Sequence, residues 1–91
     1  MDRYFKHEPN RIRLIDDELV LAEILFPAVD DETVDITRTF VDDSLRGQGI
    51  AGKLMEEAIA QLAKENKKII PTCTYAAGWF EKHPEYKGLL K

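Results

Sequence analysis

The first half of the chain shows the period-two alternation of polar and apolar residues that is typical of half-buried β-strands. Arg11 to Ile15 alternates in this way, and a longer apolar run extends from Glu18 to Phe26 before Pro27 ends it. Asp16-Asp17 supplies turn residues between the two segments. We predict that they form a β-hairpin, preceded by a polar lead-in over residues 1–10 with a turn at Pro9-Asn10.

A third strand is predicted from Thr33 to Val41, after an acidic turn at Asp30-Asp31-Glu32. Its apolar face would consist of Val34, Ile36 and Phe40. Arg38 interrupts this face, and periodicity alone does not explain it.

The second half of the chain changes to the three- and four-residue spacing of an amphipathic helix. This helix is predicted from about Ala51 to Glu65, with Asn66 as its C-cap. Its buried face would consist of Leu54, Met55, Ala58, Ile59, Leu62 and Ala63.

A short buried strand from Ile69 to Cys73 and a short helix from Tyr75 to Lys82 are predicted to follow. Pro71 removes one ladder donor from the strand and so favours an edge or a split in the sheet. The helix would group Ala76, Trp79 and Phe80 on one face, and His83-Pro84 would stop it. We expect the tail up to Lys91 to be short and polar.

Composition sets bounds on this α/β (α+β) pattern. Ninety-one residues, 44% hydrophobic and 33% charged, indicate a single folded domain over residues 1–91. The single cysteine excludes an internal disulfide and favours a reducing compartment. No apolar run is long enough for a membrane span and the N-terminus lacks a signal-peptide pattern, so the cytoplasm is expected. No His/Cys cluster has metal-ligand spacing, so no metal is expected.

The charge distribution is asymmetric. Residues 1–45 contain five Lys/Arg and twelve Asp/Glu, a net charge of −7, whereas residues 46–91 contain eight and five, a net charge of +3. An anionic ligand would meet the cationic half, and the acidic half could attract a cationic substrate. For most individual charges, a solvated surface is the simpler interpretation. Nucleic-acid binding is disfavoured, because there is no Lys/Arg stripe and the pI is about 5.1.

The stretch from Arg46 to Lys53, Arg-Gly-Gln-Gly-Ile-Ala-Gly-Lys, carries three of the five glycines at the start of the main helix. Glycines let the backbone turn tightly and approach a ligand closely. The N-terminus of the helix adds unpaired N–H groups and the positive end of its dipole. The stretch is therefore predicted to bind an anion, most often a phosphate.

Two nucleotide-binding interpretations fail on specific residues. Gly47 to Gly52 matches G-x-G-x-x-G, but a dinucleotide site needs an acidic residue roughly 20 positions later, and residues 67–74 contain none. The same stretch matches most of a Walker A motif, but Leu54 occupies the position where Ser or Thr should hold Mg²⁺.

A third pattern, Arg/Gln-x-x-Gly-x-Gly/Ala, is matched by Arg46, Gly49 and Ala51. It resembles the pyrophosphate-binding motif of the GNAT superfamily of acetyl-CoA-dependent N-acetyltransferases. The C-terminal segments 70–75, 79–80 and 83–86 resemble a small, single-domain subgroup of that superfamily. The resemblance implies a compact GNAT-like fold: a mostly antiparallel twisted sheet, one main helix after the pyrophosphate loop, and a short C-terminal helix. The chain lacks the helices usually found between the first two strands.

The resemblance implies that acetyl-CoA or coenzyme A is the cosubstrate, and that an amine, on a small molecule or a protein, is the acceptor. The pantetheine of acetyl-CoA would pair with the strand backbone near Phe40 and Val41. Its diphosphate would lie on the backbone amides from Arg46 through Gly52, and its thioester would point into a gap beside the strand ending at Cys73. The residues in this cofactor set are Phe40, Val41, Arg46, Gly47, Gln48, Gly49, Ile50, Ala51 and Gly52.

Three side chains are candidates for catalysis. Cys73 could be a nucleophile or a proton donor, although a free cysteine is most often a small buried apolar residue. Tyr75 and Tyr86 could protonate the departing thiolate, although each could serve in packing alone. His83 could act as a base or simply end the helix. Glu32, Asp42 and Asp43 could attract an amine, although turn and capping roles are the simpler interpretation. The alternative to an enzyme is a catalytically weak acyl-CoA-binding or regulatory module.

Overall fold

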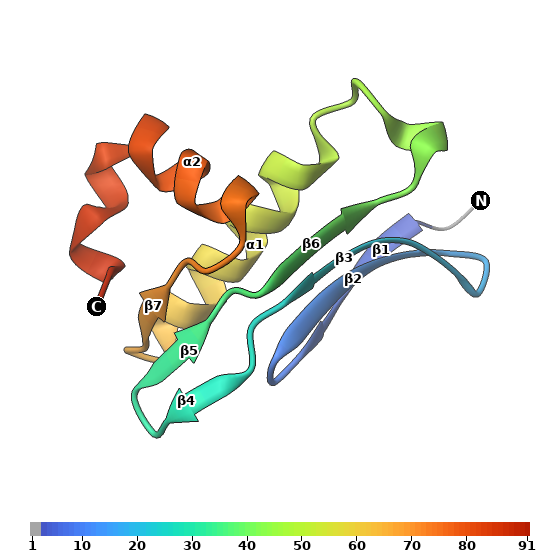
Figure 1. Ribbon diagram of the computed structural model, residues 1–91. Helices are drawn as coiled ribbons and strands as arrows, with labels where there is room; N and C mark the ends of the chain where they lie inside the picture. Colours follow the sequence, from blue (N-terminus) through green and yellow to red (C-terminus); the bar gives the residue numbers. More distant parts are fainter. Residues whose placement is uncertain (1–2) are drawn as a thin grey trace.

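The structure is a computed structural model of the chain, and it describes residues 3–91 (Figure 1). In chain order the elements are β1 (Arg3–Glu8), β2 (Arg11–Asp16), β3 (Leu19–Leu25), β4 (Ala28–Asp30), β5 (Thr33–Asp35), β6 (Arg38–Val41), the 3₁₀ helix η1 (Asp43–Leu45), α1 (Ile50–Lys64), β7 (Lys68–Ile70), α2 (Thr74–Lys82) and the 3₁₀ helix η2 (Pro84–Leu89).

The strands form two sheets that separate between β6 and β7. One is antiparallel, with the order β1-β2-β3-β6, and the other has the order β4-β5-β7, in which β5 and β7 run parallel. At the closed end of the split, the Ile36 amide donates to the Ile70 carbonyl and the Cys73 amide donates to the Ile36 carbonyl, both at 2.8 Å. β6 is thus an edge strand whose free edge faces the split.

The strand register of the four-stranded sheet defines two faces. The inner face packs on α1 and consists of Phe5, His7, Ile12, Leu14, Ala22, Ile24, Thr39 and Val41. The outer face has three rows across the strands. These rows are Tyr4-Ile15-Val20, Lys6-Arg13-Glu23-Phe40 and Glu8-Arg11-Leu25-Arg38. Figure 1 shows α1 behind this sheet, on its inner side.

The main helix agrees with the sequence pattern at both ends. α1 runs from Ile50 to Lys64, and five of the six predicted apolar positions are buried, all except Ala63. Asn66 has a left-handed backbone with φ 58°, and the amides of Asn66 and Lys67 donate to the carbonyls of Ala63 and Leu62. These two bonds form a Schellman motif, which satisfies carbonyls at the end of the helix.

The predicted hairpin is confirmed as β2 and β3, but the polar lead-in is wrong. Residues 3–8 form β1, which pairs antiparallel with β2 through its whole length. Its alternation is hidden because one inward position is His7, a polar residue that bonds to α1 rather than packing in the core. The turn at Pro9-Asn10 is present.

The single strand predicted from Thr33 to Val41 is also wrong, because Ile36 and Thr37 separate β5 from β6. The break shifts the alternation of faces: Val34 and Ile36 are buried in the core, but Phe40 lies on the outer face. Arg38 lies on the outer face as well, with its guanidinium 5.6 Å from the centre of the Phe40 ring. The residue that appeared to interrupt an apolar face therefore belongs to a different face.

The C-terminal half differs from prediction in length and in its tail. β7 is three residues long and ends before Pro71, whereas α2 matches its predicted range, with Ala76, Trp79 and Phe80 buried. The tail is not simply polar. It forms η2, its Leu89 and Leu90 pack against the core, and Leu90 forms a parallel bridge with Ile69.

Candidate functional site

The glycine stretch forms a tight loop between η1 and α1. The Asp42 carboxylate caps η1 by accepting hydrogen bonds from the Ser44 amide at 3.0 Å and the Ser44 hydroxyl at 2.6 Å. Gly47 and Gly49 then adopt left-handed backbone angles, with φ of 83° and 70°. L-residues with a side chain rarely adopt such angles, so the loop favours glycine at both positions.

The loop presents backbone amides without internal partners. Gly49 is the N-cap of α1, and the first amide to donate within the helix is that of Lys53, which bonds the Gly49 carbonyl at 3.2 Å. The amides of Ile50, Ala51 and Gly52 therefore have no intrahelical acceptor. The amides of Arg46 and Gln48, in contrast, donate to Asp43 and Leu45 within the turn.

A groove of about 310 Å³ lies over these amides. One wall is the end of β6 and the loop, and the other wall is Tyr75 from the start of α2. The groove residues are Val41, Asp42, Leu45, Arg46, Gly47, Gly49, Ile50, Ala51, Gly52 and Tyr75. A Cβ at Gly52 would lie 3.7 Å from the Tyr75 hydroxyl, an ordinary van der Waals contact, so the two residues face each other across the groove.

Arg46 supplies a cation at the mouth of the groove. Its guanidinium donates to Asp43 at 2.7 Å, but both side chains are more than four-fifths exposed. Such a pair contributes at most about 1 kcal/mol. The guanidinium is thus free to turn to an anionic ligand at little cost.

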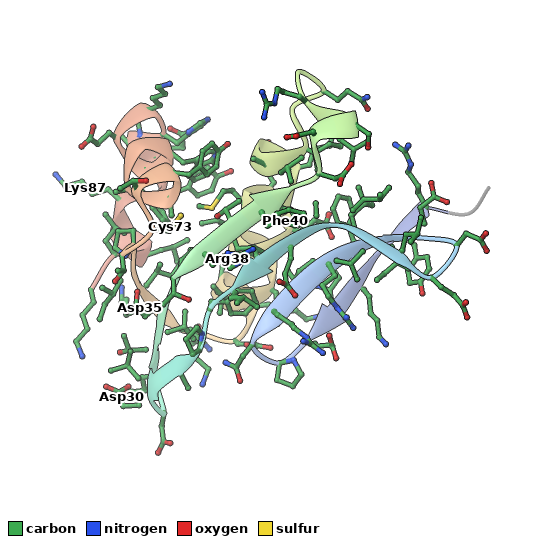
Figure 2. The ribbon with its side chains drawn as sticks, turned by 45° about the vertical axis from the view of Figure 1, so that its right-hand side comes forward. Asp30, Asp35, Arg38, Phe40, Cys73 and Lys87 are labelled. Atoms are coloured by element: carbon green, nitrogen blue, oxygen red, sulfur yellow. The ribbon has the colours of Figure 1, made fainter. Side chains whose placement is uncertain are left out.

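Cys73 lies at the split between the sheets and is the N-cap of α2 (Figure 2). Its Sγ is 3.6 Å from the Thr39 hydroxyl on β6, so these two side chains meet across the split. Burial raises the pKa of the Cys73 thiol, but polar contacts with the Ala76 amide, the Thr39 hydroxyl and the Tyr75 amide outweigh it. The net effect lowers the pKa. The thiol is half-buried.

The two tyrosines lie in different places. Tyr75 lines the groove at the glycine loop, and burial raises the pKa of its hydroxyl, which keeps it protonated as a donor. Tyr86 stacks on Trp79 at 5.3 Å and lines a separate hollow between α1 and η2. His83 stacks on Trp79 at 4.0 Å, with Nδ1 2.8 Å from the Trp79 carbonyl oxygen. Tyr86 is not among the residues that line the groove.

The predicted cofactor residues divide into those that line the groove and those that do not. Seven of the nine line it, all except Phe40 and Gln48. The Phe40 side chain faces the outer side of the sheet, although its backbone belongs to the edge strand β6. Thr39 was missed by the sequence reasoning, because a threonine in a strand carries no motif, and only the split brings it to Cys73.

The arrangement combines an anion site with two proton-bearing groups. The loop amides and Arg46 suit a diphosphate, and the free edge of β6 suits an extended polar chain. Tyr75 lies beside the groove, and Cys73 lies beside the split. A model of the GCN5-related N-acetyltransferase family matches residues 11–89. The chain belongs to this family.

The chain is also similar to a curated protein. Protein NATD1 of Xenopus tropicalis is 35% identical over 63 residues, which are 69% of this chain and 58% of that protein. The chain thus matches little more than half the length of this curated relative.

Two solved structures extend the comparison to the fold. The solution NMR structure of a GCN5-like protein from Staphylococcus aureus is 31% identical and has a TM-score of 0.79, over 97% of this chain and 87% of that one. A GNAT family acetyltransferase from Elizabethkingia anophelis, solved with acetyl-CoA bound, is 20% identical and has a TM-score of 0.61, over 84% of this chain and 51% of that one. The predicted GNAT-like α+β fold is confirmed.

Two features are absent from residues 3–91. No group of His, Cys, Asp and Glu side chains in this range could hold a metal ion. No helix in the same range is long and apolar enough to cross a membrane.

Proposed function

We propose that the chain binds acetyl-CoA at the glycine loop and transfers the acetyl group to an amine acceptor. The observation that carries this proposal is the set of unpartnered amides at Ile50, Ala51 and Gly52, which lie under a groove of about 310 Å³. Family membership agrees with it, as does the acetyl-CoA bound to the Elizabethkingia anophelis structure.

The residues present fit the cosubstrate from its diphosphate to its thioester. The loop amides and Arg46 would hold the diphosphate, and Val41 on the free edge of β6 would bond the amides of the pantetheine. The backbone N–H and C=O of Phe40 face Glu23 on β3 instead, because Asp42 already bonds Leu21 and hydrogen-bonded pairs alternate along an antiparallel ladder. The split next to Cys73 would receive the thioester end. Acetyl-CoA would supply an activated acyl group, which an amine can attack directly.

Each catalytic candidate has a distinct role in this scheme. The Tyr75 hydroxyl, whose raised pKa keeps it protonated, would give a proton to the leaving thiolate. Cys73, whose pKa is lowered, would line the split as a polar side chain or act as an alternative acyl acceptor. Tyr86 remains a candidate, but its position in a separate hollow makes a packing role on Trp79 the simpler one.

A second candidate function, acyl-CoA binding without efficient catalysis, is supported by the side chains that line the groove. Among the described residues, its only carboxylate is Asp42, which is engaged by the Ser44 amide and hydroxyl, and no histidine lines it. A base for the incoming amine is therefore missing from the groove itself. On this observation the chain would be an acyl-CoA-binding module with little turnover of its own.

Thermal unfolding with coenzyme A tests the binding site. At about 100 times the dissociation constant, the ligand should raise the Tm of wild type by roughly 10–20 °C. Gly49→Asp and Arg46→Glu should abolish this rise, because they place a carboxylate at the anion site. Gly88→Asp and Lys64→Glu are matched controls at open, exposed positions outside the groove, and they should keep the rise. An equal rise in all five proteins would rule out the loop as the binding site.

Acetyl transfer separates the two candidate functions. Release of free coenzyme A from acetyl-CoA should depend on an added amine, tested with a panel of small amines and a lysine peptide. Tyr75→Phe should lower kcat while leaving the coenzyme A-induced rise in Tm intact. Binding without release across the whole panel would favour the acyl-CoA-binding module.

A further inference from the structure

The outer face of the four-stranded sheet is uncovered within the described residues. The main helix α1 contacts β2, β3 and β6 on the other face, and the C-terminal helices follow β7. Figure 2, turned from the view of Figure 1, shows Arg38 and Phe40 on β6, which is one edge of this face. Four strands at about 4.8 Å spacing make the face about 15 Å wide.

The charge of this face is opposite to that of the whole chain. Two adjacent rows carry four cations, Lys6, Arg11, Arg13 and Arg38, and two carboxylates, Glu8 and Glu23. The face therefore has a net charge of +2, whereas the chain has a net charge of −4. A positive surface on an acidic protein attracts acidic partners selectively.

Several hydrogen-bond donors on this face have no acceptor. The Glu8 carboxylate is already engaged by Arg11 at 2.6 Å and Arg13 at 3.1 Å. Among residues 3–91, Lys6 and Arg38 take part in no ion pair, and the Nε of Arg13 is buried without a hydrogen-bond partner. Acceptors from outside the described chain could reach Lys6 and Arg38, but not the buried Nε of Arg13.

Apolar groups lie between and beside the charges. Tyr4 and Val20, in the first row, are 51% and 39% exposed. Phe40 lies under the Arg38 guanidinium, and Leu25 is half-buried between Arg11 and Arg38. A ligand that alternates carboxylates with apolar side chains would match both components.

We infer that the outer face docks an acidic segment of a partner polypeptide, with carboxylates on Lys6 and Arg38 and apolar side chains on Phe40 and Tyr4. Nucleic acid fits less well, because Glu8 and Glu23 interrupt the cations and would lie against a continuous row of phosphates. A second copy docked face to face fits less well, because two faces of +2 repel each other. The small area predicts a weak, salt-sensitive contact.

Titration of ¹⁵N-labelled protein with a synthetic peptide tests this docking. The peptide is Glu-Leu-Glu-Phe repeated three times, with blocked ends, and a second peptide replaces each Glu by Gln. We expect shift changes at β1, β2, β3 and β6 with the Glu peptide, much smaller ones with the Gln peptide, and loss of binding in 0.5 M NaCl. The variant K6E/R38E should bind about tenfold more weakly.

A matched double variant, K64E/K87E, makes the same change of net charge at exposed positions on α1 and η2, and it should bind like wild type. Well-dispersed spectra of both variants confirm that they fold. Equal weakening in both variants, or shifts confined to the glycine loop, would overturn the inference. Tighter binding of an oligouridylate than of the Glu peptide would also overturn the inference. So would a dimer of wild type, detected by sedimentation, that the K6E/R38E substitutions dissociate.

Discussion

Asp43 competes for the cation that the anion site needs. Its carboxylate accepts a hydrogen bond from Arg46 at 2.7 Å in the free protein, and it adds a negative charge beside the predicted diphosphate. Asp43→Asn should therefore strengthen coenzyme A binding a few-fold, because the exposed ion pair that is lost contributes at most about 1 kcal/mol. Calorimetric titration measures this change.

Asp17→Asn is the control for that experiment, because Asp17 is an exposed acid in the β2–β3 turn, and asparagine tolerates its positive φ of 49°. It should leave the affinity unchanged. A weaker or unchanged affinity in Asp43→Asn would contradict the competition.

The Thr39 hydroxyl tunes Cys73 from across the split. It is 3.6 Å from Sγ and is one of the groups that lower the pKa of the thiol. Thr39→Val removes this contact at similar volume, so the pKa should rise and alkylation near pH 8 should slow a few-fold. The pH dependence of the iodoacetamide rate measures the pKa directly.

Thr39→Ser keeps the hydroxyl, so the midpoint of its pH–rate profile should equal that of wild type. This control separates the effect of hydrogen bonding from that of packing. If Thr39→Val and wild type share one midpoint, the helix amides alone set the pKa of Cys73.

At the scale of residues, the sequence predicts those parts of the site that depend on local backbone chemistry. The glycine loop and Arg46 precede the main helix and line one groove with Tyr75, which is a candidate through the resemblance alone. Thr39 and the outward side chain of Phe40 could not be placed, because both depend on the break at Ile36-Thr37, which tertiary pairing with β7 and β3 creates.

At the scale of elements, strongly periodic segments are predictable, and segments held by tertiary bonds are not. The β2–β3 hairpin, α1 and α2 follow from periodicity and end signals. β1 does not, because its inward His7 bonds to a helix some fifty residues away. η2 likewise depends on the packing of Leu89 and Leu90 against a core that its own sequence does not reveal.

His7 makes the attachment of β1 to α1 dependent on pH. Its Nδ1 is 2.7 Å from Gln61 Oε1 and its Nε2 is 2.6 Å from Glu57 Oε1. Gln61 Nε2 donates to the Glu8 carbonyl, which leaves Oε1 facing His7. Both neighbours are thus acceptors, so the ring must carry both protons to bond them.

The hydrogen bond to Gln61 is the main cause that raises the pKa of His7, opposed by desolvation and reinforced by Glu57. A raised pKa in the folded state gives stability that is complete below the unfolded pKa of about 6.5 and is lost as pH rises through the folded value. The Tm of wild type should therefore fall between pH 6 and pH 8.5. His7→Gln should lose most of this dependence, and parallel Tm profiles for the two proteins would contradict the attachment.

At the scale of the whole molecule, the split between the sheets does not divide the core. One buried cluster includes Ile12 and Ile24 from the four-stranded sheet, Val34 and Ile69 from the other sheet, and Leu62 from α1. The radius of gyration of 12.7 Å is close to the value of about 12 Å expected for a compact domain of this length. The split is therefore a surface opening above a continuous core.

A continuous core predicts that both sheets unfold together. Trp79, the only tryptophan, lies on α2 and reports on the C-terminal side, whereas far-UV circular dichroism reports on all elements. Urea transitions followed by the two signals should coincide. Leu62→Ala should lower both midpoints equally, because a fully buried leucine costs about 2–5 kcal/mol when truncated. A fluorescence transition at lower urea than the dichroism transition would show that α2 and β7 detach first. In that case Tyr75 on α2 would not form a rigid wall of the groove opposite the glycine loop.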